Sequence, residues 1–278
     1  MPSTRGRSVP LFVVATPIGN LGDITERARE VLASCDAVVA EDTRHSGNLL
    51  KHLGIQKPLH SLPAFDEIAR VEPLVHRLVN GESLALVTDS GTPAVSDPGS
   101  VLVRRAVEEG VAVVPVPGAS AAVAAVSASG FPEGRFHFAG FLPRKASHRS
   151  EMLAEMRPLR AQLVFYESPQ RLAQTLADLR AELGDRQALV ARELTKVHEE
   201  LARGTLSALE RHFSGEVRGE VVIVVRGAPE AAAADPALLE ADVRARLAKG
   251  ERPKQIAEAL SGEYSKRDVY QLALKLKR

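Results

Sequence analysis

The chain has little cysteine, few aromatic residues and no long apolar run. Its 278 residues include one cysteine, Cys35, and no tryptophan, and aromatic residues make up 4% of the total. A single thiol cannot form a disulfide framework or a thiolate zinc cluster within the chain, which suits a reducing cytoplasm. No apolar run approaches the roughly 18 residues of a membrane span, so we expect no membrane association and a cytoplasmic location.

Several common ligand and catalytic motifs are also missing. No glycine is followed by lysine, as a P-loop requires, and no two of the 20 glycines are separated by a single residue, as a Rossmann fingerprint requires. The eight histidines form no H-x-H or H-E-x-x-H pair, so we expect no metal site. No G-x-S-x-G elbow is present either. These absences count against ordinary dinucleotide-binding proteins, metalloenzymes and serine hydrolases.

The residues that are present favour an α/β protein. Apolar content of 45% against 26% charged residues is enough to build a core, and the net charge is only +1. Apolar runs at 37–40, 83–88 and 111–116 alternate with helical patterns, which predicts a parallel sheet covered by helices on both faces. After about residue 125 the pattern changes to strands of mixed spacing, with a short strand and a basic loop over 135–149.

We therefore predict two α/β domains and a small helical extension. The first domain covers residues 1–117, and the second, with a mixed sheet, covers 118–230. An alanine-rich linker over 228–237 follows, and the last part, 236–278, is typical of three short helices.

The stretch LFVVATPIGNLGDITERA, residues 11–28, is the first candidate for a ligand-binding loop. An apolar strand runs into a proline- and glycine-containing loop, and a helix is predicted to begin at Asp23, a good N-cap residue. The arginines before the strand are not followed by a cleavage pattern, so we expect a tail and not a signal peptide. A simple tight turn is the alternative interpretation.

Acidic residues follow the predicted strands. Glu41 and Asp42 come directly after a buried strand, and Arg44 is close enough to neutralise one of them. Adjacent carboxylates repel, so that one of them keeps a raised pKa and acts as a base; a helix N-terminus that favours acids explains the pair equally well. Asp89 ends the next strand, and Asp97-Pro98-Gly99 precedes its helix, where two Asx turns are the alternative.

Further polar residues stand at other predicted strand ends. Ser120 precedes a helix made almost only of alanine, serine and valine, Tyr166 and Glu167 end a strand, and Glu193 and Lys196 lie in a charged segment. Tight helix packing and a solvated helix face explain these residues without any ligand. Open α/β sheets bind ligands at such strand ends.

Basic residues gather in two places. The segment 135–149 contains Arg135, Arg144, Lys145 and Arg149 and no acid, and residues 236–278 contain ten basic against six acidic residues. Within the latter, a helix-turn-helix-like pattern places Lys266 and Arg267 at the start of the last helix. A helical domain that only docks or dimerises is the alternative.

Taken in order, the motifs VATPIGNLGDIT, AEDTR, TDSGTPAVSDPG, PVPGASA, FAGFLPRK, FYESPQR, ARELTK and GEVVIVV resemble one family. The chain is similar to the bacterial ribosomal small-subunit cytidine 2′-O-methyltransferases, within the tetrapyrrole methylase superfamily. The resemblance runs from about Leu11 to Arg226, and the helical tail also fits. Two small departures occur: Ala119 replaces the proline of the usual PGPSA, and TDSGTP stands where SDAGTP is usual.

The resemblance implies S-adenosylmethionine bound in a cleft between two α/β domains, and a homodimer. Carried over by motif, the donor contacts come from eight residues, many through their backbones: Thr16, Pro17, Asp89, Gly91, Thr92, Ser120, Ala121 and Tyr166. It also implies methyl transfer to the 2′-hydroxyl of a decoding-region cytidine of 16S ribosomal RNA in the small subunit. We then expect the two groups of basic residues to contact RNA phosphates, since stacking on so few aromatic rings cannot dominate.

A base must take the proton of that hydroxyl. Glu41 and Asp42 are the first candidates and Glu193 and Lys196 the next, with Arg44 orienting the acid or holding a phosphate. Two other functions compete with this one: a methylase of the same superfamily that acts on a tetrapyrrole precursor, and an RNA-binding module without turnover. The EDTR motif and the basic extension count against the first, and the acids at strand ends count against the second.

Overall fold

The computed structural model describes residues 9–229, 236–260 and 266–277. Within these residues the chain forms two compact units. One contains both sheets and runs to Arg226 except for residues 158–160, and the other contains those three residues and the chain from Gly227.

The first sheet is entirely parallel, with the strand order β3-β2-β4-β1-β5. Its strands are β1 (Leu11–Val14), β2 (Ala37–Ala40), β3 (Leu59–Ser61), β4 (Leu84–Val87) and β5 (Val113–Val116). All four residues of β2 and of β4 are buried, as expected of strands covered on both sides. The predicted parallel sheet is confirmed.

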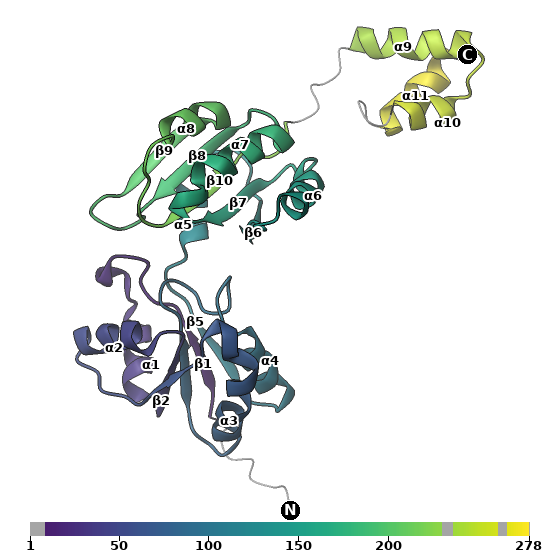
Figure 1. Ribbon diagram of the computed structural model, residues 1–278. Helices are drawn as coiled ribbons and strands as arrows, with labels where there is room; N and C mark the ends of the chain where they lie inside the picture. Colours follow the sequence, from purple (N-terminus) through teal and green to yellow (C-terminus); the bar gives the residue numbers. More distant parts are fainter. Residues whose placement is uncertain (1–8, 230–235, 261–265, 278) are drawn as a thin grey trace, which may run out of the picture. The chain divides into compact units, whose positions relative to one another are not determined.

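Helices cover both faces of this sheet (Figure 1). On one face lie α1 (Glu26–Ser34) and α2 (Thr43–His52), and on the other lie α3 (Glu67–Val79) and α4 (Ser100–Glu108). Alternate residues of β2 separate the two cores, because Val38 and Ala40 pack under α1 and α2 while Ala37 and Val39 pack under α3 and α4. Short 3-10 helices, Leu21–Asp23 and Ala64–Asp66, precede α1 and α3.

The start of α1 differs from the prediction. The helix begins at Glu26 and not at Asp23, because the Thr25 hydroxyl accepts a hydrogen bond from the Ala28 amide at 3.1 Å. The residues before it form the first 3-10 helix, which Asn20 caps by accepting from the Gly22 amide at 2.9 Å. Both Asp and Thr are good N-cap residues, and the side chain that reaches the free amides decides.

The second sheet is mixed, with the order β6-β7-β10-β8-β9, which confirms the second prediction. β6 runs parallel to β7 and the other neighbours are antiparallel. The strands are β6 (Phe136–Phe141), β7 (Gln162–Glu167), β8 (Gln187–Arg192), β9 (Glu200–Thr205) and β10 (Val221–Val225). Their helices are α5 (Ala121–Ser129), α6 (Ala146–Met156), α7 (Leu172–Leu183) and α8 (Leu206–His212), with a 3-10 turn at Pro169–Arg171.

Two features of this part matter for the site. α5 buries Ala122 and Ala125 against Val164, Leu189 and neighbouring residues of the second sheet, so its small side chains serve close packing. α6 lies where a basic loop is predicted; only Leu153 and Met156 of this helix are buried, which leaves a weak apolar pattern. The domain boundaries at 117 and 230 stay predictions.

The C-terminal unit has its own core. It contains α9 (Pro236–Ala248), α10 (Pro253–Ala259) and α11 (Lys266–Leu276), as three short helices were predicted. Val243, Ile256, Leu260 and Val269 are among its buried residues.

Candidate functional site

The strand order of the first sheet creates a crevice between β1 and β4. β1 connects to β2 past α1 on one face, whereas β4 connects to β5 past α4 on the other, so the chain leaves these neighbouring strands in opposite directions. Ligands of open α/β sheets bind outside the carboxyl ends of strands at such a switch point. Thr16 and Asp89 lie just beyond these two strand ends.

Hydrogen bonds tie together the loops that leave these strands. The Thr16 amide donates to the Gly91 carbonyl at 2.8 Å, and the Gly91 amide donates back at 3.2 Å. The Thr16 hydroxyl donates to the Thr88 carbonyl at 3.0 Å. Thr16 is buried, so its side chain and its backbone both hold the two loops together at the crevice.

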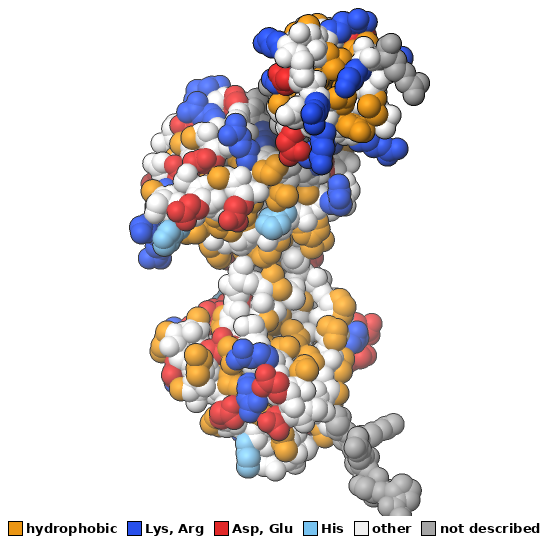
Figure 2. All heavy atoms as spheres, turned by 90° about the vertical axis from the view of Figure 1, so that its right-hand side faces the viewer, with side chains coloured by type: hydrophobic (Ala, Val, Ile, Leu, Met, Phe, Trp, Pro, Cys, Tyr) orange, Lys and Arg blue, Asp and Glu red, His pale blue; other side chains and the backbone are white. Residues whose placement is uncertain are grey.

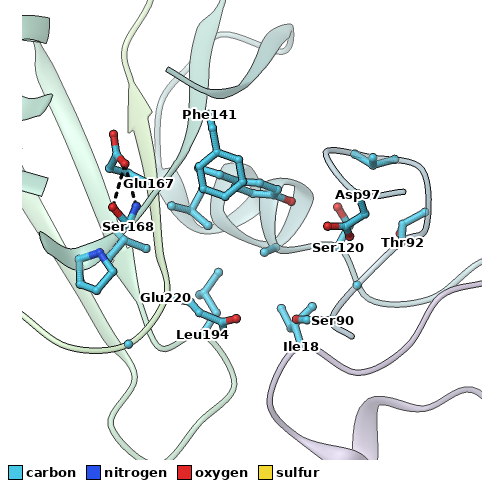
Figure 3. Close-up of a pocket in the computed structure, with 18 residues that line it drawn as sticks. Ile18, Ser90, Thr92, Asp97, Ser120, Phe141, Glu167, Ser168, Leu194 and Glu220 are labelled. Carbon is cyan, nitrogen blue, oxygen red and sulfur yellow. Dashed lines mark hydrogen bonds between the residues drawn. The ribbon is translucent and has the colours of Figure 1, made fainter. Parts of the chain in front are cut away.

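A cavity of about 320 Å³ opens between these loops and the strand ends of the second sheet (Figure 3). Five of the eight residues assigned to the methyl donor line it: Gly91, Thr92, Ser120, Ala121 and Tyr166. The Asp97 carboxylate lies beside Ser120 on one side of the cavity, and Phe141 and Ser168 lie on the other. We call it the first cavity.

An aromatic cluster forms one wall of the first cavity. The ring of Tyr166 meets Phe138 and Phe141 edge-on, with centroid distances of 4.9 and 5.7 Å. The Tyr166 hydroxyl accepts from the Ala122 amide at 3.3 Å, and burial raises the pKa of Tyr166. The hydroxyl therefore fixes the start of α5, and the ring is the part of Tyr166 that a ligand meets.

The loop after β4 is held in an unusual backbone conformation. Ala94 and Ser96 both have φ of +64°, a region that residues other than glycine seldom adopt. The Thr92 hydroxyl donates to the Ala119 carbonyl at 3.1 Å and links this loop to the start of α5. Such strain is concentrated at binding and active sites, where surrounding contacts enforce it.

Two half-buried acids lie at or near the first cavity. Asp97 lines it, and the Thr88 hydroxyl donates to Asp97 Oδ2 at 2.8 Å. Burial raises the pKa of Asp97. Glu41 lines neither cavity, and burial and, next, the carboxylate charge of Asp97 raise its pKa. Both acids are thus better proton acceptors than free carboxylates.

Asp42 and Arg44 have a different role. Asp42 caps α2 by accepting from the Arg44 amide at 2.8 Å, and its carboxylate pairs with the Arg44 guanidinium at 2.9 Å. These hydrogen bonds lower the pKa of Asp42 to about 2. Asp42 is therefore a weak base, and neither residue lines the first cavity.

Glu193 and Lys196 form an ion-pair cluster with a residue that sequence reasoning missed. Lys196 Nζ donates at 2.7 Å both to Glu193 and to Glu220, the residue before β10. The hydrogen bond from Lys196 lowers the pKa of Glu193. Burial lowers the pKa of Lys196, but the two carboxylates outweigh it and the net shift is upward. Neither residue is suited to accept a proton.

This cluster approaches the first-sheet loop at Gly19. A Cβ on Gly19 would lie 2.5 Å from Lys196 Cγ and 3.0 Å from the Leu194 carbonyl oxygen. Glu193 and Thr195 have φ of +52° and +67°, and the Thr195 hydroxyl is buried without a hydrogen-bond partner. Only a residue without a side chain fits at position 19.

A second cavity of about 350 Å³ adjoins the first. It contains the other three residues assigned to the donor, Thr16, Pro17 and Asp89, together with Lys196. The two cavities share three wall residues: Ile18, Ser90 and Glu220. His45 and Asn48 of α2 line the second cavity only.

Several cavity residues carried weak sequence signals. Asp97 and Glu167 lie in motifs that drew attention, but Ser90, Phe141, Leu194 and Glu220 were not singled out. Glu167 is buried and accepts from the Ser168 amide at 2.8 Å and from the Thr175 hydroxyl at 2.7 Å, so it holds the turn after β7. A polar residue directly beside an apolar strand, as Glu220 is beside β10, is the sequence pattern that indicates such a cavity residue.

The basic residues expected to contact RNA do not behave alike. Arg149 pairs with Asp178 at 2.6 Å and donates to the carbonyls of Pro143 and Arg144, so it holds the loop in place. Arg144, Lys145 and Arg135 are exposed. In the C-terminal unit, Lys266 pairs with Glu258 and Arg267 is exposed, and several Lys and Arg side chains are visible on that unit in Figure 2.

The described residues contain no group of three or more His, Cys, Asp or Glu side chains that could hold a metal ion. No helix among them is both long and apolar enough to cross a membrane.

Comparison with known proteins shows the family. Residues 10–210 match the family model described as Tetrapyrrole (Corrin/Porphyrin) Methylases. A protein of Xylella fastidiosa named Ribosomal RNA small subunit methyltransferase I is 48% identical, over 81% of this chain and 84% of its own length. A Haemophilus influenzae protein of the same name is 42% identical over 95% of this chain and 96% of its own length.

Solved structures share the fold. The methyltransferase CobJ is 21% identical with a TM-score of 0.61, covering 80% of this chain and 95% of that one. A diphthine synthase is 18% identical with a TM-score of 0.59, covering 79% and 90%. At these identities the likeness shows the architecture alone. The chain is a methyltransferase of the tetrapyrrole methylase family and belongs with the relatives named Ribosomal RNA small subunit methyltransferase I.

Proposed function

We propose that the chain transfers a methyl group from S-adenosylmethionine to the 2′-hydroxyl of a decoding-region cytidine in 16S ribosomal RNA. The substrate is the small ribosomal subunit, in the cytoplasm. The observation that carries the proposal is the likeness to relatives named for small-subunit ribosomal RNA over nearly the full length of both chains. The sites of donor, base and RNA contact below are parts of the same proposal.

The first cavity has the chemistry that S-adenosylmethionine requires. Its aromatic and aliphatic wall, from Tyr166, Phe141 and Leu194, suits the flat adenine ring. Gly91, Thr92, Ser120 and Ala121 border the cavity from the loop after β4 and the start of α5. Thr16, Pro17 and Asp89 border the donor on the side of the second cavity.

The proton of the 2′-hydroxyl goes to the coupled carboxylates of Glu41 and Asp97. When bound, the donor supplies a methyl group on a positively charged sulfur, which becomes a neutral thioether as the new carbon–oxygen bond forms. The Thr88 hydroxyl holds Asp97, and the raised pKa of Glu41 and of Asp97 suits a general base. The other candidates for the base have positioning roles. Asp42, held by Arg44, positions α2, and Glu193 and Lys196 position the loop after β8.

The RNA is held by exposed basic side chains. Arg135, Arg144 and Lys145 of the second sheet's edge and Lys266 and Arg267 of α11 contact phosphates, and Arg149 orders the loop that carries Arg144. Phosphate contacts position RNA without reading its sequence, so recognition of one nucleotide depends on the shape of the assembled subunit and on the cavities. We also propose a homodimer, as the resemblance implies.

Methyl transfer to small ribosomal subunits tests the proposal. Subunits that lack the modification are incubated with the protein and labelled S-adenosylmethionine, and the RNA is mapped by mass spectrometry. We expect label on the ribose of a single cytidine. If no label appears although calorimetry shows that the donor binds, the ribosomal substrate is wrong. Methylation of a tetrapyrrole precursor in a parallel reaction supports the competing small-molecule function.

A further inference from the structure

The second cavity has a set of wall residues that methyl-donor binding does not use. His45, Asn48 and Leu49 all come from α2, at spacings of three and four residues that place them on one face of the helix. His45 and Asn48 are exposed, so a ligand can reach them from solvent. Leu21, beside the shared residue Ile18, supplies apolar surface from the loop after β1.

We propose that the second cavity receives the target nucleotide, turned out of the RNA, and that His45 and Asn48 contact its base. This inference rests on the proposed function. The acceptor must lie next to the methyl group, and the shared wall of Ile18, Ser90 and Glu220 is where two ligands in the adjoining cavities meet.

The wall chemistry suits a nucleoside. A base has apolar faces and a polar edge, and the cavity offers Leu21 and Leu49 for the faces and the Asn48 amide, which both donates and accepts, for the edge. Asp89 stands near the shared wall, where a ribose hydroxyl is expected. Enzymes that modify a base turn the nucleotide out into a pocket whose side chains contact the polar edge of the base, and the second cavity is open to solvent in the same way.

α2 is firmly positioned for this task. Asp42 caps its first turn, and the Asp42 amide donates to Asp89 Oδ1 at 3.3 Å, which connects α2 to the loop after β4. Lys196 stands on the opposite wall and is held by Glu193 and Glu220. Its charge is already balanced by these carboxylates, so a neutral base meets no unpaired charge there.

The test compares residues of the cavity with matched residues just outside it. His45→Ala and Asn48→Ala remove the proposed contacts, and His52→Ala and Gln56→Ala remove exposed side chains of the same types that line neither cavity. We expect each cavity variant to raise the KM for small subunits about three- to tenfold, as the loss of one hydrogen bond predicts. The Kd for S-adenosylmethionine, measured by calorimetry, stays unchanged, and the control variants match the wild type.

A substitution that fills the cavity gives the sharper test. Asn48→Trp is expected to abolish methyl transfer while donor binding and the melting temperature are retained. Gln56→Trp is expected to leave methyl transfer, donor binding and the melting temperature unchanged. Loss of donor binding in Asn48→Trp or Asn48→Ala would assign the second cavity to the donor and overturn the inference, as would an unchanged KM in both alanine variants. If the wild type itself methylates no subunit, the proposed function is wrong. This outcome is distinguishable from a failure of the inference about the second cavity, in which the wild type is active.

Discussion

The loop after β4 and the loop after β8 both border the first cavity, but they are held in different ways. Each contains two residues other than glycine with positive φ, Ala94 and Ser96 in one and Glu193 and Thr195 in the other. In the loop after β4, hydroxyl groups donate to the Ala119 carbonyl and to the half-buried carboxylate of Asp97. The loop after β8 is held by Lys196 between two carboxylates, partly exposed to solvent.

This difference separates two tasks. Asp97 in the first loop has no cation among its hydrogen-bond partners, and burial raises its pKa, which leaves it able to take a proton. Glu193 in the second loop has a lowered pKa because it bonds to Lys196, which keeps it charged and fixed. We propose that the first loop carries the proton acceptor, and that the second loop, the closing loop, closes the site.

The largest expected effect comes from removing the proposed proton acceptors, Glu41 and Asp97. Glu41→Gln and Asp97→Asn each remove one of the coupled carboxylates and should slow methyl transfer about 100-fold or more, the usual contribution of a general base. Asp42→Asn is the matched control, because asparagine also caps helices, and its rate should stay near that of the wild type. Single-turnover transfer measures the rates. Wild-type rates in both Glu41→Gln and Asp97→Asn would exclude the pair as the base.

The same pair predicts a dependence on pH. Methyl transfer should rise as the pair ionises, above the usual carboxyl range, and Asp97→Asn should move any residual rise to lower pH because one repelling charge is gone. For stability, a raised folded pKa of Glu41 favours folding only below the unfolded carboxyl pKa, and this contribution is lost as pH rises through the folded value. Glu41→Gln should therefore melt at a higher temperature at neutral pH, and this advantage should vanish in acid.

A smaller effect is expected where the loop after β1 meets the loop after β8. In Gly19→Ala the new methyl group would lie 2.5 Å from Lys196 Cγ and 3.0 Å from a backbone oxygen, so the loop after β8 must move away. We expect a roughly tenfold fall in kcat/KM, as misplaced site residues commonly cause. Gly215→Ala, where a Cβ meets nothing within 4 Å, should change little. Equal activity in both variants would show that methyl transfer does not need the close contact between Gly19 and the loop after β8.

Much of the fold could be predicted from apolar patterns. Strands such as β2 and β4 are short, continuous apolar runs, and the parallel sheet follows from their alternation with helices. α6 was missed because only two of its side chains are buried, and the start of α1 was misplaced because two adjacent segments offer good caps. Which of several possible N-cap residues begins a helix depends on the contacts of its side chain, which one sequence does not reveal.

The site was less predictable than the fold. Acids and glycines at the ends of β1 and β4 drew attention, since strand ends of parallel sheets meet at one edge. Glu220 and Phe141 were missed because their place in the cavity depends on which loops of the two sheets come together. The sequence predicts that Arg44 neutralises one of the two adjacent acids, but it does not reveal which one. Asp42 and Glu41 have opposite pKa shifts because Asp42 bonds Arg44 and Glu41 is partly buried near Asp97.

The smallest expected effect comes from the ion pairs of the closing loop. Lys196→Met and Glu220→Gln, alone and combined, form a double-mutant cycle in which the pair's coupling should be about 1 kcal/mol or less, because the Glu220 side chain is 66% exposed and water screens the charges. Urea unfolding measures the free energies, and added salt should reduce the coupling. Arg218→Met with Glu216→Gln is a matched control on a more exposed pair, where the coupling should be smaller still. A coupling of several kcal/mol that salt leaves unchanged would mean that the closing loop is held as firmly as the loop after β4, and the contrast between the two loops would then lie in their charge alone.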